Sequence, residues 1–385
     1  MRVLIILKYI PSAVHDQKSD LLGSSIKAHQ IEGHEVVLLT SGRSEQHGWK
    51  EIKTSWNLLQ KVRTALSLKY KKSFSGSGLS FYVASEAARF HKRYPVDMIF
   101  AECTTYYPAL HAYEISRALG VPFVIREHKI YERKIKVIDD LREDYLRALR
   151  AADAVVAVSP LLASLMKDIG VRDDIGHIPN ALSDEFFSPP ADYGQYRDWA
   201  GSDFIFAGWT RWRDFKRVDL LLKAFSKVLR NGCRARLVIA GPLEPAENER
   251  WVYDYIKEQG LAEQVLLTGG VSRAEIHRLA HSCHCCVVPS DYETFGLPAL
   301  EALAAGKPVV TTRCNGPEYV VDSEQLGRVV ERGSVEELFK GMLEVYADYE
   351  AFDRVMISRS AYERFSRSKV AGQFTALYED ILNKR

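Results

Sequence analysis

The stretch CCVVPSDYETFGLPALEALAAGKPVVTT, residues 285–312, contains one complete pattern of strand, helix and strand. The apolar run at 285–288 has the length of a buried strand, and Gly296 provides a turn after it. Pro298 suits the first turn of a helix, and Gly306 ends that helix before the next apolar run begins. Such a repeat is typical of a parallel sheet that is covered by helices.

Similar apolar runs of strand length recur along the whole chain, and helical patterns separate them. They begin at Val3, Val36, Met98, Pro122 and Ala154 in the first half, and at Phe204, Leu237, Val265, Cys285 and Pro308 in the second. Two successive sets of this kind predict an α/β fold with two doubly wound, Rossmann-like domains. Ligands of such sheets bind beyond the carboxyl ends of the strands, so we expect the domains to face each other across a cleft.

A chain of 385 residues is long enough for two hydrophobic cores. The sequence Ser188-Pro189-Pro190, followed by the polar run DYGQYRDWAGSD, marks the expected boundary. We therefore predict an N-terminal domain at 1–188 and a C-terminal domain at 200–367. An amphipathic helix is expected at 368–385, and the sequence leaves open whether it packs on the N-terminal domain.

The formal net charge of +2 argues against a surface adapted to nucleic acid. Basic residues nevertheless outnumber acidic ones between residues 43 and 95, where aromatic side chains also occur. This region fits either a solvated helical face or a surface that meets an anionic membrane or an anionic acceptor. No apolar run reaches the roughly 18 residues of a membrane span. We expect a cytoplasmic protein, with peripheral membrane contact as the second interpretation of 43–95.

The six cysteines have no spacing that suggests a disulfide framework. Cys283, His284, Cys285 and Cys286 include residue types that bind metals, but they run directly into an apolar strand. Adjacent residues of a strand face opposite sides of the sheet, and no second ligand pair lies at zinc spacing. We interpret this segment as a buried strand and expect no metal there.

The turn before Pro298 is a candidate phosphate site. An open helix N-terminus has unpaired amides and the positive end of the helix dipole, which suit an anion such as a diphosphate. Glu301, expected in the first helical turn, can accept hydrogen bonds from ribose hydroxyls, and Glu293 lies where it can reach a sugar. The alternative for Glu301 is that an acid is simply favoured near a helix start.

This segment closely resembles the two-glutamate motif of the group 1 family of retaining GT-B glycosyltransferases, which includes phosphatidylinositol mannosyltransferases. The resemblance implies that Glu293 lies beside the donor sugar and that Glu301 holds the ribose. The backbone amides expected to bind the diphosphate belong to Phe295, Gly296 and Leu297.

The resemblance extends over most of the chain. Residues 152–159 and 178–180 look like the end of the family's first domain, although Ala181 replaces the usual glycine. Residues 206–222 look like the loop in which an arginine and a lysine clamp the donor phosphates. Within this loop, Gly208 and Lys216 match the family's glycine and lysine. The loop is about two residues longer than usual, so either Arg211 or Arg213 is expected to serve as the arginine, and Arg217 stands where glycine is usual.

A fixed cation suits this loop for a physical reason, because the departing nucleotide diphosphate gains charge as the glycosidic bond breaks. The alternative for Lys216 is an exposed lysine at a helix start. His128 falls where the family often has a histidine that contacts the transferred sugar. The alternative is that His128 is simply a residue at the end of a strand. Glu127 is either a cleft residue on the acceptor side or a solvated acid. Asp16 and Gln17 occupy the place of the family's glycine-rich acceptor loop.

The resemblance implies a metal-independent, retaining transferase that needs no cofactor, uses a nucleotide diphosphate sugar as donor and acts on a glycan or a lipid-linked sugar. A role in cell-envelope polysaccharide synthesis would fit. The alternatives are a sugar phosphorylase or epimerase of the same fold, and a catalytically silent regulator that binds nucleotide sugars. A nicotinamide-dependent oxidoreductase is excluded, since no Gly-x-Gly-x-x-Gly turn follows the first strand.

Overall fold

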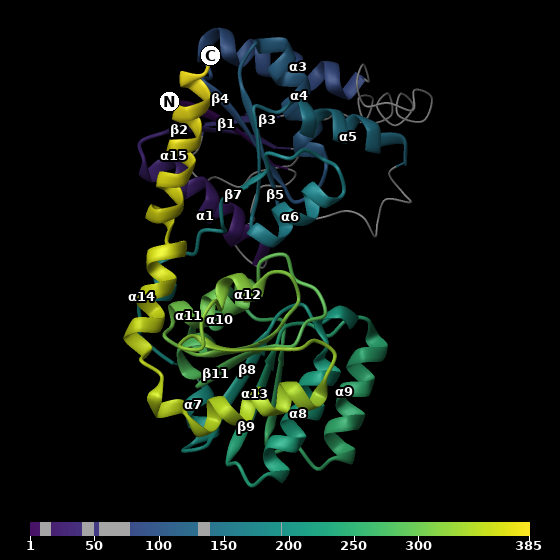
Figure 1. Cartoon of the computed structure of the whole chain (residues 1–385), viewed down its shortest axis with the longest axis vertical. Helices are drawn as coiled ribbons and strands as arrows, with labels where there is room; N and C mark the ends of the chain where they lie inside the picture. The colour runs from purple at the N-terminus through teal and green to yellow at the C-terminus, as the bar shows by residue number, and fades with distance from the viewer. Residues whose placement is uncertain (8–16, 41–49, 54–77, 130–138, 194) are drawn as a thin grey trace. The chain divides into compact units, whose positions relative to one another are not determined.

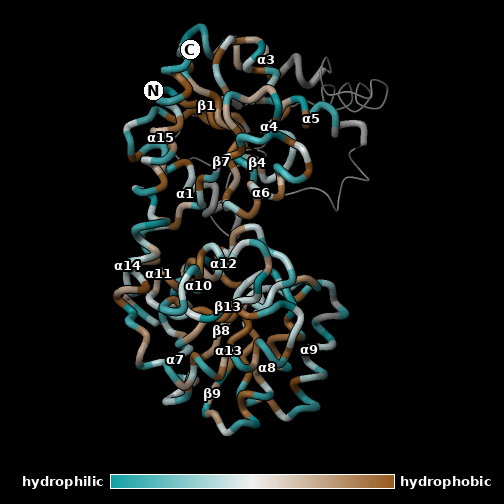
Figure 2. The backbone as a smooth tube through the Cα atoms, in the orientation of Figure 1, coloured by the Kyte–Doolittle hydropathy of each residue, from teal (hydrophilic) through white to brown (hydrophobic). Residues whose placement is uncertain are grey.

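The protein is described by a computed structural model, in which residues 1–7, 17–40, 50–53, 78–129, 139–193 and 195–385 are placed (Figure 1). The chain divides into two compact units. The first unit comprises Met1–Ala181 together with Arg367–Arg385, and the second comprises Leu182–Ser366. The hydrophobic segments of each unit follow its own strands, and hydrophilic segments lie toward the outside (Figure 2). Each unit therefore has its own core.

In the described part of the chain, the first unit contains a seven-stranded parallel sheet with the order β3-β2-β1-β4-β5-β6-β7. Its strands are β1 (Arg2–Leu7), β2 (Glu35–Thr40), β3 (Lys50–Lys53), β4 (Met98–Cys103), β5 (Phe123–Glu127), β6 (Ala154–Ala157) and β7 (Gly176–His177). The apolar side chains of the central strands are almost fully buried, which agrees with a parallel sheet covered on both faces.

The helices of the first unit connect and cover these strands. They are α1 (Gln17–Ile31), α3 (Gly78–Arg93), α4 (Tyr107–Leu119), α5 (Asp139–Ala151), α6 (Pro160–Asp168) and the C-terminal α15 (Arg367–Asn383). Helix α15 packs beside α1, and its Phe374 and Tyr378 join the same core as Val3 and Phe100. The final helix thus completes the core of the first unit, although it is distant in sequence.

The second unit contains a six-stranded parallel sheet with the order β10-β9-β8-β11-β12-β13. Its strands are β8 (Phe204–Trp209), β9 (Ala235–Ala240), β10 (Val265–Gly269), β11 (Cys285–Val288), β12 (Val309–Thr312) and β13 (Gly327–Val330). Its helical segments are η2 (Asp184–Phe187), α7 (Gln195–Ala200), η3 (Asp214–Lys216), α8 (Val218–Arg230), α9 (Ala246–Glu258), α10 (Arg273–Ser282), α11 (Leu297–Ala304), α12 (Pro317–Val320), α13 (Val335–Ala347), η4 (Tyr349–Ala351) and α14 (Arg354–Phe365).

Both sheets have the same doubly wound order, in which the chain starts in the middle and moves outward in both directions. The reversal lies between β1 and β4 in the first unit and between β8 and β11 in the second. Loops that leave these two pairs of strands diverge, and the crevice between them is where open α/β sheets bind ligands. The topology therefore predicts ligand-binding residues in the segments that follow β4, β8 and β11.

The fold class predicted from the sequence is confirmed, since every apolar run named above contributes a strand. Three strands were not predicted, namely β3, β7 and β13. They are short, their sequences are KEIK, GH and GRVV, and all three lie at sheet edges. An edge strand is paired on one side only and needs less apolar character, so the pattern of a buried run is weak there.

The expected boundary at residue 188 differs from the division in the structure, where the first unit ends at Ala181. Residues 182–188 belong to the second unit because they pack against it. Leu182 N donates to Phe365 O at 2.9 Å, and the ring of His281 bonds the buried Phe186 through its backbone oxygen. The proline pair that marked the boundary therefore lies within the second unit.

Candidate functional site

Two loops of the second unit meet beyond the carboxyl ends of β8 and β11, where Asp291 N donates to Phe215 O. Two glycines allow close packing around them. A Cβ atom on Gly208 would lie 3.1 Å from Val287 O and 3.0 Å from the ring of Trp212. Gly296 has φ 92°, and a Cβ there would lie 2.8 Å from the Pro317 ring. Gly208 thus allows close packing against β11 and Trp212, whereas Gly296 is required for its left-handed backbone conformation.

Lys216 and Glu293 lie together beyond the carboxyl ends of β8 and β11. Lys216 ends η3, and its ammonium group contacts Glu293 Oε1. Each of the two side chains is 13% exposed, so the pair is largely shielded from water while still reaching the surface. Ser290 Oγ also donates to Glu293 Oε1, at 3.3 Å. The structure thus brings together two of the residues that the sequence predicted as catalytic.

Arg217 holds the two loops in this arrangement. Its φ of 54° lies in the left-handed region, which glycine adopts more easily than arginine. This agrees with the glycine that the resembled family usually has at this position. The guanidinium group donates to both carboxylate oxygens of Asp219 at 2.9 and 3.0 Å, and to Asp291 at 3.1 Å. Asp291 N also donates to Phe215 O at 2.8 Å. The loop after β8 is therefore fastened to the loop after β11 directly beside Lys216.

The turn that precedes α11 presents unpaired amides. The backbone amides of Phe295, Gly296 and Leu297 have no hydrogen-bond acceptor among the described residues. The neighbouring turn at residues 314–318 packs against this one, since a Cβ atom on Gly316 would lie 2.4 Å from Phe295 N. Within that turn, the Glu318 carboxylate accepts hydrogen bonds from the backbone amides of Cys314, Asn315 and Gly316. Consecutive unpaired amides at a helix start suit an anion.

Glu301 lies deeper than the sequence suggested. It is the fifth residue of α11, so the expectation that it lies in the first helical turn was wrong. Its side chain is only 4% exposed, and both carboxylate oxygens already have partners. Trp209 Nε1 donates to one oxygen at 2.5 Å, and Arg273 Nη1 donates to the other at 2.5 Å. The helix dipole does not explain this acid, because its partners come from β8 and α10.

The two arginines predicted as alternatives lie apart from the pair of Lys216 and Glu293. Arg211 and Arg213 are about half exposed, and both approach Glu244 in the loop that follows β9, at 3.6 and 3.3 Å. Neither makes a contact with Glu293 or Glu301 in the described part of the chain.

In the first unit, Glu127 ends β5 and His128 follows it. Glu127 is completely buried, so the alternative of a solvated acid was wrong. Burial raises the pKa of its carboxyl group well above the usual value, although a hydrogen bond from Tyr145 Oη at 2.5 Å opposes the shift. Burial thus favours the protonated form of Glu127. Asp16 and the side chain of Gln17 lie outside the described residues.

His128 contacts a carboxylate that the sequence analysis did not select. Its Nε2 atom lies 2.8 Å from Oε1 of Glu102, the penultimate residue of β4, and Arg126 Nη1 lies 2.7 Å from the same oxygen. Glu102, Arg126, Trp209 and Arg273 were all missed. A charged residue inside an otherwise apolar strand, as in MIFAEC and PFVIRE, was the available signal for the first two.

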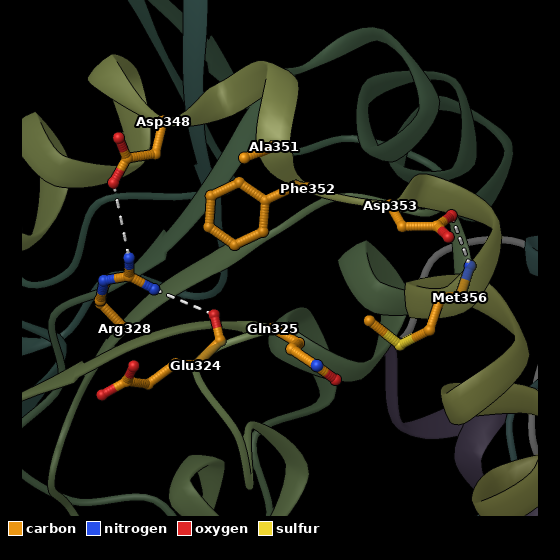
Figure 3. A pocket seen from close by; sticks show the side chains of 8 residues that line it. All are labelled: Glu324, Gln325, Arg328, Asp348, Ala351, Phe352, Asp353 and Met356. Atoms are coloured by element: carbon orange, nitrogen blue, oxygen red, sulfur yellow. Dashed lines mark hydrogen bonds and ion pairs between the residues drawn. The ribbon is translucent and has the colours of Figure 1, made fainter.

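A separate cavity of about 410 Å³ lies in the second unit, where β13 and α14 begin (Figure 3). It is lined by Glu324, Gln325, Arg328, Asp348, Ala351, Phe352, Asp353 and Met356. It includes none of the predicted site residues. Among its lining residues, Arg328 approaches Asp348 at 3.8 Å, and Asp353 caps α14 through the backbone amides of Val355 and Met356.

Cys285 and Cys286 lie in β11 and are buried with free thiols, as the interpretation of this segment as a strand predicted. Among the placed residues we find no group of three or more side chains arranged to hold a metal ion. The same part of the chain contains no helix that is both long and apolar enough to cross a membrane.

Two family models match the chain, one in each half. The model of glycosyl transferases group 1 matches residues 199–364, and the model of Glycosyltransferase Family 4 matches residues 26–186. The chain belongs to the group 1 family of GT-B glycosyltransferases. The first match includes the whole donor-site candidate described above, from Gly208 to Glu301, and the second includes Glu102 and His128.

The curated relatives of this family member are distant. It is 27% identical to a D-inositol 3-phosphate glycosyltransferase of Stackebrandtia nassauensis over 69% of this chain and 64% of the relative. It is 28% identical to a mannosylfructose-phosphate synthase of Agrobacterium fabrum over 60% of this chain and 53% of the relative. The matched segments thus span less than two thirds of these relatives.

Solved structures agree with the fold over the whole chain. The Anabaena protein HepE, in complex with UDP-glucose, superposes with a TM-score of 0.76 and 18% identity over 99% of this chain and 100% of that one. A sucrose-phosphate synthase of Thermosynechococcus elongatus gives a TM-score of 0.77, also at 18% identity, over the full length of both chains. These similarities establish the GT-B fold of this family member.

Proposed function

We propose that this protein is a metal-independent, retaining glycosyltransferase that binds a nucleotide diphosphate sugar beyond β8 and β11 of the second unit. The main support is the position of the Lys216 ammonium group beside Glu293, in the loop next to the unpaired amides of Phe295, Gly296 and Leu297. A diphosphate would accept hydrogen bonds from these amides, and Lys216 would neutralise part of its charge.

The chemistry would then depend on charge stabilisation. As the bond between the sugar and the diphosphate breaks, negative charge grows on the leaving phosphate, and a fixed cation stabilises that state more than the ground state. A unit charge pair about 4 Å apart is worth roughly 4 kcal/mol at an effective dielectric constant near 20, before desolvation. This cation would replace a divalent metal, and the leaving phosphate would help to deprotonate the acceptor hydroxyl.

Glu293 would orient the donor sugar. Its carboxylate is already aligned by Lys216 and Ser290, so it can accept hydrogen bonds from sugar hydroxyls without reorganising. Glu301 would hold the ribose through lone pairs that Trp209 and Arg273 leave available, since each carboxylate oxygen can accept two hydrogen bonds. Trp209 and Arg273 thereby fix the orientation of the ribose ligand.

The acceptor is proposed to be a hydroxyl group of a glycan or a lipid-linked sugar. The relatives named above are a D-inositol 3-phosphate glycosyltransferase and a mannosylfructose-phosphate synthase, and these names support a hydroxyl-rich acceptor. The remaining parts of this proposal are a cytoplasmic location, a role in cell-envelope polysaccharide synthesis and peripheral membrane contact through 43–95. Most of that region lies outside the described residues.

Product analysis tests this function. The purified protein is incubated with UDP-, GDP- and ADP-linked sugars and a panel of glycan and polyol acceptors. We expect release of the nucleoside diphosphate together with a new glycoside, unchanged activity in EDTA, and an anomeric proton coupling that matches the donor. Formation of a sugar 1-phosphate would indicate a phosphorylase, and an epimerised donor would indicate an epimerase. Binding without any product would support a silent regulator.

A further inference from the structure

Two side chains at the ends of neighbouring strands form a buried pair in the first unit. β4 and β5 pair in parallel with Glu102 opposite Arg126, and His128 N donates to Cys103 O at 3.2 Å. This register places His128 beside Glu102, and their side chains meet with Nε2 2.8 Å from Oε1. Glu102 is 1% exposed and His128 4% exposed. The pair lies at the carboxyl edge of the sheet, beside the reversal between β1 and β4.

Arg126 immobilises the carboxylate of this pair. Its Nη1 atom donates to Glu102 Oε1 at 2.7 Å, while Nε and Nη2 donate to the backbone oxygens of Ile178 and Pro179 at 3.1 and 2.6 Å. Nη2 also donates to Asn180 Oδ1 at 3.0 Å. The guanidinium group is thus anchored on the segment after β7, and the Glu102 carboxylate has a single well-defined position.

The protonation state of the pair follows from its surroundings. Burial would raise the pKa of Glu102, but the charge of Arg126 and the contact with His128 offset this and hold the pKa at about 2. An ionised carboxylate only accepts hydrogen bonds, so His128 Nε2 must carry the proton. Burial lowers the pKa of His128, which keeps the imidazole neutral at pH 7. Its Nδ1 atom therefore has a lone pair.

Within the described residues, the imidazole of His128 makes its hydrogen bond through Nε2 to Glu102, and no donor contacts Nδ1. Glu102 Oε2 is also buried without a partner in this part of the structure. An imidazole acceptor without a partner among the described residues is available to a hydroxyl group of a ligand.

We propose that Glu102 is a positioning residue, which holds His128 in the Nε2–H tautomer so that Nδ1 accepts a hydrogen bond from a hydroxyl group of the sugar substrate. This inference rests on the proposed function and adds a residue to it. The carboxylate acts through the imidazole and does not touch substrate. The arrangement uses the same physical logic by which a buried carboxylate orients the histidine of a catalytic triad.

A double-mutant cycle tests the coupling. In Glu102→Ala the hydrogen bond to His128 is lost, and we expect kcat/KM to fall by tenfold or more. In a His128→Ala background, Glu102→Ala should change kcat/KM by less than about twofold, because the residue through which it acts is absent. Asp153→Asn is the control, since Asp153 bonds Phe123 N and Arg385 in the same unit but not His128. Its effect should be additive with His128→Ala.

The pH profile provides a second measurement, with Glu102→Gln as the variant. Gln keeps the acceptor oxygen for Arg126 and His128 but removes the charge. The charged groups that act on His128 are Glu102, which raises its pKa, and Arg126 and Lys129, which lower it. Removing the carboxylate charge therefore lowers the pKa of His128, and the acid limb of kcat/KM, where the protonated imidazole cannot accept, should move to lower pH.

The outcomes separate this inference from the proposed function. If wild-type protein transfers sugar but the cycle is additive and the acid limb of Glu102→Gln stays in place, Glu102 is structural and the inference is wrong. If Glu102→Ala does not fold, the pH profile of Glu102→Gln decides. If the wild-type protein releases no nucleoside diphosphate from any nucleotide sugar, the proposed function fails, and the inference fails with it.

Discussion

At the scale of single residues, the proposed donor site depends most on Lys216, which lies beyond the carboxyl ends of β8 and β11 in the second unit. Lys216→Ala removes the ammonium group that lies beside Glu293. We expect turnover to fall by roughly 10²-fold or more, because charge on the leaving diphosphate loses its fixed counterion. Steady-state release of nucleoside diphosphate measures this. Lys340→Ala, which removes an exposed lysine paired with Glu337, is the control and should leave turnover unchanged.

The indole of Trp209 allows a narrower test of Glu301. Trp209→Phe keeps an aromatic ring but removes the Nε1 donor that holds Glu301 Oε2 at 2.5 Å. We expect the Kd of the bound nucleoside diphosphate to rise about fivefold to tenfold, which corresponds to about one hydrogen bond. Calorimetric titration measures it. Trp212→Phe removes an equally buried indole donor, whose partner is Ala240 O at 3.0 Å, and should leave the Kd within about twofold.

A similar loss of affinity in both tryptophan variants would contradict the account of Glu301. It would mean that the change comes from general loosening of β8 and its loop, which both indoles stabilise. An unchanged Kd in Trp209→Phe would show that Glu301 needs no alignment by this donor.

At the scale of elements, the loops after β8 and β11 were only partly predictable. Gly296 and Pro298 marked the start of α11 correctly, because a turn glycine and a first-turn proline have local conformational causes. The partners of Glu301 were not predictable, since Trp209 is 92 positions away in the chain and meets it only through the pairing of β8 with β11. Glu102 was missed for the same reason, because its contact with His128 depends on the register of β4 and β5.

Arg217 offers a test of how these loops are held together. Its left-handed backbone costs roughly 1–2 kcal/mol for a residue with a side chain, while its two partly exposed ion pairs contribute about 0.2–1 kcal/mol each. Arg217→Gly should therefore change the melting temperature by only a few degrees, as both terms are removed together. The KM for the donor should rise severalfold, because η3 is no longer fastened to Asp291.

Arg217→Ala is the matched variant, because it loses the same ion pairs but keeps the strained backbone. It should melt at a lower temperature than Arg217→Gly. If the alanine variant were the more stable of the two, or if both kept the wild-type KM, the role of Arg217 would be misassigned.

On the scale of the whole molecule, both units contain buried neutral histidines that link stability to pH. Burial lowers the pKa of His29, His111, His281 and His284 to about 4. Their usual value is 6.5, so the unfolded chain binds more protons as the pH falls from about 6.5 to about 4. Stability should decrease through that window. Glu127, whose pKa is raised, opposes the trend, but it is one group against four.

Urea unfolding at pH 7 and pH 5 measures this linkage. The midpoint should be lower at pH 5, and His29→Gln should reduce the difference, since that histidine is replaced by a side chain that does not titrate. A midpoint that is equal or higher at pH 5 would show that Glu127 or other carboxyl groups dominate the proton balance.

The central claim is that the crevice beyond β8 and β11 binds a nucleoside diphosphate group. Thermal unfolding of the full-length protein with UDP, GDP and ADP, compared between wild type and Lys216→Ala, tests it most directly. We predict that at least one of the three nucleotides raises the wild-type melting temperature, and that Lys216→Ala loses most of the rise while Lys340→Ala keeps it. If none of the nucleotides raised the melting temperature, or if Lys216→Ala were protected as well as wild type, the claim would be contradicted.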